Sequence, residues 1–162
     1  MTIDEYNQIV YDQSDALFRF ALKNIRVVED AQEIVQIAFE KLWINKDKVD
    51  PTKYKAYLFR IAYNTMIDII RKQKKEVDME SITVPEGQAQ SSEYRGLKKV
   101  LDKAFEEISD IQRTVIMLRD YEGYSYSEIG EITGLNESQV KITIFRGRQT
   151  LQKILGKLED YL

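Results

Sequence analysis

The sequence predicts an all-α protein made of two small helical domains joined by a flexible acidic linker, the second domain being a helix-turn-helix. Three observations support this fold class. Apolar residues recur at spacings of three and four along most of the chain, no segment alternates as a strand does, and a polar interval divides the pattern in two. We place the first domain at residues 1–75, the linker at 76–95 and the second domain at 96–162.

The first domain is expected to hold three packed helices. Thr2 and Glu5 have the spacing of a capping box, in which each side chain bonds the backbone N–H of the other, so the first helix begins there. Asp30 and Glu33 have the same spacing and predict the start of the second helix. Pro51 suits the first position of the third helix, because an N–H at that position would lack a partner.

The interval at 76–95 carries five acidic side chains and one basic side chain, together with Pro85 and Gly87. This composition is typical of a solvated tether, which has too little apolar surface to fold. The same acidic charge would also allow the interval to cover a basic surface when nucleic acid is absent. The sequence is compatible with both interpretations.

The second domain is expected to contain four helices. Their predicted positions are Ser92–Ile108, Ser109–Glu122, Tyr126–Thr133 and Glu137–Gly156. Ser125 and Glu128 have the spacing of a capping box, and so do Asn136 and Gln139. Between these two helix starts, Gly134 can adopt the positive φ of a tight turn. The last two helices are therefore predicted to form a helix-turn-helix.

The final helix is basic. Five Lys or Arg residues and no acidic residue lie between Ser138 and Lys157. In a helix-turn-helix, the first turns of the second helix reach base edges in the major groove, while basic side chains contact phosphates. The candidate DNA-binding residues are Ser138, Gln139, Lys141, Ile142, Arg146 and Arg148. The alternative is an ordinary amphipathic helical hairpin with a solvated basic face.

A second basic region lies at 53–75, where seven Lys or Arg residues are opposed only by Asp68. Although the formal net charge is −3, the chain therefore has two basic regions, one at 53–75 and one in the final helix. Because carboxylates lie elsewhere on the chain, we expect only modest affinity for DNA without a partner.

The residues that are absent exclude several classes of protein. The chain has no cysteine and no histidine, so it lacks disulfides, thiolate nucleophiles and the usual zinc ligands. No apolar run reaches the length of a membrane span. We expect a cytoplasmic protein that binds no membrane, metal or cofactor and is not an enzyme. The enzymatic alternative is a nuclease that uses magnesium and carboxylate pairs such as Glu29 and Glu33.

Three segments together carry a resemblance over nearly the whole chain. They are DAQEIVQIAFEKLW at Asp30–Trp43, YKAYLFRIAYNTMIDIIRKQKK at Tyr54–Lys75 and SYSEIGEITGLNESQVKITIFRGRQTL at Ser125–Leu151. In this order and spacing the chain resembles a sigma factor of the extracytoplasmic-function (ECF) group. The resemblance implies a promoter-specificity subunit that binds bacterial core RNA polymerase and promoter DNA, and an anti-sigma factor that masks it.

The resemblance also implies roles for individual residues. The first segment resembles the helix that docks on the coiled coil of the polymerase beta-prime clamp, with contacts expected from Glu33, Gln36, Phe39 and Glu40. Ile37 departs from the family pattern, which commonly has an acidic residue there. Leu118 and Tyr121 are candidates for contact with the beta flap, with core packing as the alternative.

The second segment resembles the element that melts the minus-ten promoter DNA and captures a flipped base. Its candidate residues are Lys53, Lys55, Tyr57, Arg60, Asn64 and Arg71. An amide can pair with a base edge, an aromatic ring can stack on a base, and cations can hold phosphates. Tyr57 stands where tryptophan is frequent in the family.

The third segment would read the minus-thirty-five element, with Thr143 in place of a common arginine. The rival hypothesis is a free-standing helix-turn-helix regulator that dimerises and binds a palindrome, which requires a self-complementary dimer surface. Tight binding to an inverted repeat without polymerase would favour that rival.

Overall fold

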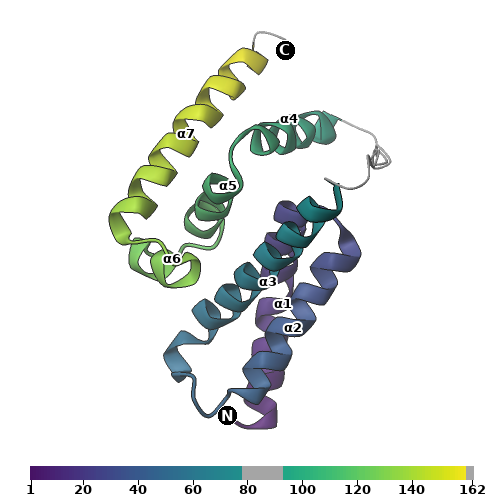
Figure 1. The fold of residues 1–162 in the computed structure, drawn as a ribbon, viewed down its shortest axis with the longest axis vertical. Helices are drawn as coiled ribbons and strands as arrows, with labels where there is room; N and C mark the ends of the chain where they lie inside the picture. The colour runs from purple at the N-terminus through teal and green to yellow at the C-terminus, as the bar shows by residue number, and fades with distance from the viewer. Residues whose placement is uncertain (78–92, 160–162) are drawn as a thin grey trace.

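The structure is a computed structural model that describes residues 1–77 and 93–159 (Figure 1). Within these ranges all regular structure is helical, which confirms the all-α prediction. The elements are α1 (Ile3–Ile25), α2 (Val28–Ile44), the 3-10 turn η1 (Pro51–Lys53), α3 (Tyr54–Val77), α4 (Glu93–Glu107), α5 (Asp110–Ile116), the π-helical turn η2 (Met117–Tyr121), α6 (Tyr126–Thr133) and α7 (Glu137–Glu159). None of these helices is both long and apolar enough to cross a membrane.

Helix α1 begins as predicted. The Thr2 hydroxyl accepts a hydrogen bond from the Glu5 N–H, and the Glu5 carboxylate accepts one from the Thr2 N–H, both at 3.1 Å. The helix ends at Ile25, and the next residue, Arg26, adopts a left-handed conformation with φ of 61° and donates its N–H to the Leu22 carbonyl. This left-handed residue turns the chain directly into α2.

The start of α2 differs from the prediction. Val27 is the residue before the helix, and valine has no polar atom with which to cap it. The predicted capping box of Asp30 and Glu33 is therefore wrong. Asp30 lies inside the first turn, where its carboxylate accepts a hydrogen bond from the Gln73 side chain of α3 at 3.0 Å. The Asp30 carboxylate therefore bonds another helix and does not cap α2.

Helix α3 starts as the sequence indicates. The Asp50 carboxylate accepts hydrogen bonds from the Thr52 N–H at 2.9 Å and the Thr52 hydroxyl at 2.8 Å, and Pro51 follows it at the first position of η1. These hydrogen bonds lower the pKa of Asp50. At its other end α3 continues to Val77, and α4 begins at Glu93. Both ends of the predicted linker are thus helical, and its remainder lies outside the described residues.

The helix-turn-helix has the predicted caps. Ser125 with Glu128, and Asn136 with Gln139, each form both hydrogen bonds of a capping box. Gly134 adopts the predicted left-handed conformation, with φ of 83°. These local signals therefore located both helix starts and the turn between them.

The segment before the helix-turn-helix is not the single helix predicted at Ser109–Glu122. Helix α5 ends at Ile116 and continues as the π-helical turn η2. After this turn the Tyr124 N–H donates to the Leu118 carbonyl at 3.0 Å, and the Tyr124 ring is buried. The wider turn therefore redirects the chain so that Tyr124 points inward.

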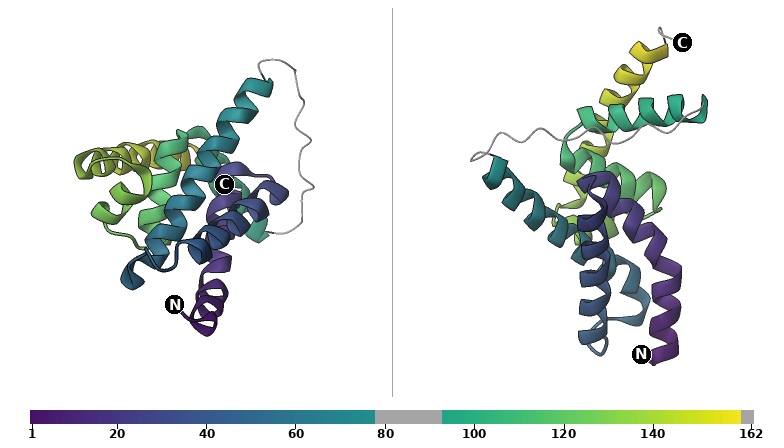
Figure 2. Two further views of the ribbon diagram at one scale, coloured as in Figure 1. Left: turned by 60° about the horizontal axis from the view of Figure 1, so that its bottom comes forward. Right: turned by 90° about the vertical axis from the view of Figure 1, so that its right-hand side faces the viewer.

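The two halves of the chain pack against each other, a feature that the sequence did not predict. Helix α6 lies along α3, and the C-terminal part of α1 meets α5 (Figures 1 and 2). Buried residues of both halves form one continuous apolar cluster. The ring of Phe59 from α3 stands edge-on between the rings of Phe20 and Tyr124, with centroids 5.3 Å from each. The first and second domains thus share a core.

Candidate nucleic-acid and polymerase interfaces

Helix α7 separates a buried side from an exposed side. Val140, Ile144 and Gly147 face the rest of the domain and are buried. The predicted base-reading and phosphate-binding side chains are exposed: Ser138, Gln139, Lys141, Ile142, Arg146 and Arg148. The structure thus presents all six candidates to solvent on a helix held from behind by apolar packing.

Phe145 belongs to the same exposed surface and was missed at the sequence level. Its side chain is 61% exposed. It lies two helical turns after Ser138 and one turn after Ile142, so the three share one side of α7. Its apolar character resembled that of a core residue, but its position in the helical repeat could have placed it outside. An exposed aromatic beside Ile142 can contact thymine methyl groups in a major groove.

Arg148 is bound within the protein. The Asp120 carboxylate of η2 accepts hydrogen bonds from Arg148 Nε at 3.3 Å and from Arg148 Nη2. The hydrogen bonding to Asp120 raises the pKa of Arg148. The positive charge predicted to bind phosphate is therefore partly neutralised by a neighbouring carboxylate.

A cluster of cations surrounds Tyr126 at the start of α6. The Arg119 guanidinium lies 4.4 Å from the centre of the Tyr126 ring, and the Lys141 ammonium lies 5.5 Å from it. Arg119 also donates to the Tyr124 carbonyl at 2.9 Å. Cations are attracted to the negative face of an aromatic ring, so Tyr126 contacts both Arg119 and Lys141. This arrangement adds Arg119 to the basic residues close to α7.

The minus-ten candidates follow one side of α3. Tyr57, Arg60, Asn64 and Arg71 are separated by three, four and seven residues, which places them in one stripe of the helix. Arg60, Asn64 and Arg71 are exposed, as are Lys53 and Lys55. Tyr57 is half-buried, and its hydroxyl accepts a hydrogen bond from the Asn45 side chain at 3.1 Å.

A cavity of about 390 Å³ lies at the N-terminal end of this stripe. Tyr57 and Arg60 line it, together with Asn45 and Lys53 from the preceding loop and turn. Its wall also includes Glu131 of α6, whose Oε1 lies 3.8 Å from Lys53 Nζ. Aromatic, amide and cationic groups converge here, which is the chemistry that an unstacked base and its phosphate require. Two carboxylates also line the cavity, Asp50 from the loop before α3 and Glu131 from the second domain.

The polymerase-binding candidates on α2 need one correction. Glu33, Gln36 and Glu40 are exposed. Phe39 is only 7% exposed, and its carbonyl accepts a hydrogen bond from the Tyr6 hydroxyl at 2.9 Å. Phe39 lies next to the buried side of α2, so it packs against α1 and is not the exposed aromatic that was predicted.

Apolar side chains stand beside the acidic face of α2. Ile3 and Ile44 are 66% and 76% exposed. With Glu40 and Trp43 they line a cavity of about 550 Å³ at the end of α1 and α2. Ile3 and Ile44 therefore provide the exposed apolar surface that was predicted for Phe39. The sequence did not indicate that either residue is exposed, because an apolar residue in the helical pattern is expected to be buried. Ile3 is the first residue of α1 and Ile44 is the last residue of α2, so neighbouring helices do not cover them.

The two flap candidates differ in exposure. Leu118 is fully buried, so its core-packing alternative is the correct one. Tyr121 is 47% exposed, with the Lys23 ammonium 5.1 Å from the centre of its ring. Among the described residues no group of three or more acidic side chains is placed to hold a metal ion.

Comparison with known proteins adds a family context to this geometry. The model of sigma-70 region 2 matches residues 10–76, and the model of sigma-70 region 4 matches residues 94–151. The chain is 31% identical over 170 residues to the ECF RNA polymerase sigma factor SigW of Bacillus subtilis, covering 96% of this chain and 91% of SigW. It is 29% identical over 161 residues to SigM of the same organism, covering 97% of each chain. Among solved structures, the sigma factor RpoE in complex with the anti-sigma factor NepR from Bartonella quintana is similar, with a TM-score of 0.82 and 26% identity over 95% of this chain and 98% of that one.

Proposed function

Since the chain belongs to the family of ECF RNA polymerase sigma factors, we propose how the three surfaces described above divide the work of this promoter-recognising subunit. Residues 1–75 form the domain that binds polymerase and the minus-ten DNA, and residues 96–162 form the domain that reads the minus-thirty-five DNA. The observation that carries this division is that each family match contains one exposed basic surface, on α3 and on α7. A dimeric helix-turn-helix regulator is not favoured, because it has no use for a region 2 domain.

The minus-thirty-five element is read by the exposed side of α7. Ser138 and Gln139 bond base edges, and Ile142 contacts thymine methyl groups. The cationic residues Lys141, Arg146 and Arg148 bind the flanking phosphates, which fixes the helix in the groove without reading sequence. Support for this assignment comes from the exposure of all six side chains on one rigid helix.

The minus-ten element is melted at the cavity beside α3. Tyr57 offers a face for stacking, Asn64 an amide for a base edge, and Lys53, Lys55, Arg60 and Arg71 hold the strand. Unpairing a base costs a few kcal/mol, which these contacts offset. The stripe that runs from Tyr57 to Arg71 supports one continuous path for a single strand.

Core polymerase binds the acidic face of α2. Glu33, Gln36 and Glu40 meet the beta-prime clamp coiled coil, and Tyr121 is the candidate for the beta flap. Ile3 and Ile44 contribute apolar surface next to Glu40, because interfaces combine polar rims with buried apolar contacts. RNA synthesis is performed by the polymerase, so the chain itself catalyses no step. It acts where polymerase and chromosome meet, in the cytoplasm.

An anti-sigma factor is the proposed regulatory partner. The related RpoE structure was solved with such a protein. In this chain a cavity of about 640 Å³ lies between α1 and α4, with Phe18, Leu22 and Phe105 among its apolar residues and Lys23 at its edge. An amphipathic segment with acidic residues would complement that lining.

The decisive experiment is an electrophoretic shift of promoter DNA with and without core polymerase, followed by run-off transcription on a genomic library. We expect a shifted complex and specific transcripts only when both the chain and the core enzyme are present. A chain that fails to associate with bacterial core polymerase, or that binds an inverted repeat tightly by itself, would contradict the proposal.

A further inference from the structure

One acidic side chain lies in the middle of the basic surface on α3. Asp68 is the only acidic residue between residues 53 and 75 of the sequence, and its side chain is exposed. It follows Asn64 by four residues and precedes Arg71 by three, so it lies on the same side of the helix as both. A surface that bound only phosphates would bind DNA more tightly without this charge, because a carboxylate repels phosphate. The carboxylate therefore indicates a contact other than phosphate.

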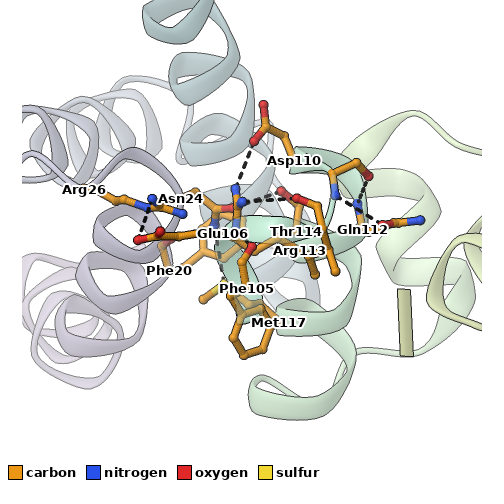
Figure 3. A network of polar contacts seen from close by, with 12 residues as sticks. Phe20, Asn24, Arg26, Phe105, Glu106, Asp110, Gln112, Arg113, Thr114 and Met117 are labelled. Carbon is orange, nitrogen blue, oxygen red and sulfur yellow. Dashed lines mark hydrogen bonds and ion pairs between the residues drawn. The ribbon is translucent and has the colours of Figure 1, made fainter. Parts of the chain in front are cut away.

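Asp68 has no partner among the side chains that the structure describes, with which it forms neither an ion pair nor a hydrogen bond. Charged side chains at the junction of α1, α4 and α5 are different (Figure 3). There the Arg26 guanidinium bonds the Glu106 carboxylate at 2.9 Å, and the Arg113 guanidinium bonds the Asp110 carboxylate at 2.9 Å. The carboxylate of Asp68 is thus available to accept a hydrogen bond from another molecule.

Packing on the opposite side of α3 fixes the direction of Asp68. Leu58, Ala62 and Met66 lie on that side and are buried in the core. Because these side chains fix the rotation of α3 about its axis, Asn64 and Asp68 point away from the core. A group on such a rigid helix is positioned more precisely than a group on a loop.

The position of Asp68 along α3 indicates which part of a promoter it meets. The cavity proposed for the unpaired base lies at the N-terminal end of the helix, beside Tyr57. Asp68 lies about 16 Å further along the helix axis and about 6 Å beyond Asn64. The domain proposed to read the minus-thirty-five element follows the C-terminal end of α3 in the chain, so this end points to the upstream duplex. Asp68 therefore meets base pairs at the upstream edge of the unpaired region.

A carboxylate distinguishes base pairs by hydrogen bonding. It has acceptors and no donor, so it bonds an exocyclic amino group but not the acceptor atoms of guanine or thymine in the major groove. Asp and Glu suit the N4 amino group of cytosine, whereas adenine is read by an amide that bonds N6 and N7 together. Arg60 and Arg71 lie on either side of Asp68 along α3 and can bind the flanking phosphates. Phosphate contacts on both sides would leave the carboxylate facing a base edge.

We propose that Asp68 is a specificity-determining residue of the minus-ten surface: its carboxylate accepts a hydrogen bond from the N4 amino group of a cytosine next to the unpaired region. The inference rests on the proposed function, because it uses α3 as the minus-ten surface. It adds a base preference upstream of the captured base, and it gives the negative charge on this basic helix a function.

Promoter binding by the full chain with core polymerase tests this role. The probes derive from a promoter recovered by run-off transcription, in which each base pair at the upstream edge of the unpaired region is changed in turn to the other three. At one position we expect the unaltered chain to bind the cytosine promoter about tenfold more tightly than the other three, which corresponds to about 1.4 kcal/mol. Electrophoretic shifts measure these affinities.

Two variants of Asp68 should change this preference in different ways. Asp68→Ala should bind all four promoters within about twofold of one another, and it should bind the three without cytosine more tightly than the unaltered chain, because the repelling charge is gone. Asp68→Asn keeps an acceptor and adds a donor, so it should also accept the O4 of thymine or the O6 of guanine at that position. A loss of stability could not produce such a change in base preference.

Asp15→Ala is the matched control, since it removes the same charge from an exposed position on α1. It should leave the base preference unchanged. If Asp68→Ala tightened binding to all four promoters by the same factor, Asp68 would act only as a repelling charge. If Asp68→Ala kept the base preference of the control, Asp68 would contact no base. Either result overturns the inference and leaves the proposed function standing, whereas an unaltered chain that fails to associate with core polymerase contradicts both.

Discussion

The carboxylate of Asp120 binds the guanidinium of Arg148 through two hydrogen bonds, one from Nε and one from Nη2. Arg148 lies on the helix proposed to read DNA, and Asp120 lies on the π-helical turn before the helix-turn-helix. The pair therefore places a negative charge next to a proposed phosphate contact, and it holds α7 against η2. A DNA phosphate and the Asp120 carboxylate would therefore compete for the Arg148 guanidinium.

Replacing Asp120 by Asn should strengthen the attachment of the chain to promoter DNA with polymerase. The neutral side chain leaves the Arg148 charge free for a phosphate, so the slope of log affinity against log salt should steepen by about 0.9. A salt series in an electrophoretic shift measures this slope. Asp102→Asn on α4 is the control, and an Asp120→Asn slope equal to that of the control would show that Arg148 contacts no phosphate.

Phe145 and Ile144 are neighbours with opposite expected effects. Phe145→Ala should leave the melting temperature unchanged and weaken DNA binding by about fivefold, because burial of part of an aromatic side chain is worth on the order of 1 kcal/mol. Ile144→Ala should destabilise the fold by about 2–5 kcal/mol, because Ile144 is 2% exposed in the core. Thermal unfolding and DNA binding of both variants check this. A large drop in stability for Phe145→Ala would contradict its exposed position.

Asn64→Ala should impair promoter opening more than promoter attachment. The lost amide would remove one hydrogen bond to an unpaired base, worth about 1.4 kcal/mol or roughly a tenfold change in the open fraction. Permanganate reactivity of unpaired thymines measures opening, and an electrophoretic shift measures attachment. Unchanged permanganate reactivity would show that Asn64 does not bind an unpaired base.

Gly130→Ala should destabilise the helix-turn-helix by about 1–3 kcal/mol, because a Cβ at Gly130 would lie 2.7 Å from the Leu135 carbonyl oxygen. That oxygen belongs to the backbone of the turn and cannot rotate away. Gly96→Ala in α4 is the matched control, with no atom within 4 Å of the added Cβ. It should stabilise the helix by about 0.5–1 kcal/mol. Denaturant unfolding gives the change in the free energy of unfolding for both variants. Equal changes would mean that the turn accommodates the added Cβ without strain.

Alkaline pH should destabilise the folded chain. Burial raises the pKa of Tyr124 well above its ordinary value of 10.0, and the nearby carboxylates of Glu122 and Glu128 raise it further. The folded chain therefore keeps a proton that the unfolded chain loses above about pH 10, so stability is full below that pH and declines above it. Tyr124→Phe should reduce this decline, with Tyr11→Phe at an exposed position as control. Denaturant midpoints between pH 8 and about pH 11 give the comparison, and parallel curves for all three proteins would rule Tyr124 out as the cause.

Local signals in the sequence predicted most helix starts. Thr2, Ser125 and Asn136 each form the capping box that their spacing indicates, because a capping box involves only residues three apart. The same spacing at Asp30 failed, because α2 begins earlier, at Val28, so that Asp30 lies inside the first turn and bonds Gln73 of α3. A pattern that is read along the chain cannot anticipate a partner that lies 43 residues away.

The candidate sites divide in the same way. The helical repeat of α7 indicated that the six minus-thirty-five candidates are exposed, since side-chain direction in a helix follows from position alone. It did not show that Phe39 is covered by α1 or that Arg148 is paired with Asp120. Both facts depend on which other element lies beside the residue.

The sequence by itself determined the all-helical class, the helix-turn-helix and the two basic surfaces, because caps, turn glycines and periodic apolar residues act over a few residues each. Only the tertiary structure decided that α6 rests on α3 and that Glu131 reaches Lys53. The docking depends on the summed burial of residues such as Asn24, Phe59 and Tyr124, which are far apart in the chain. No short-range sequence pattern predicts this burial, since these residues become buried only when the two domains pack together.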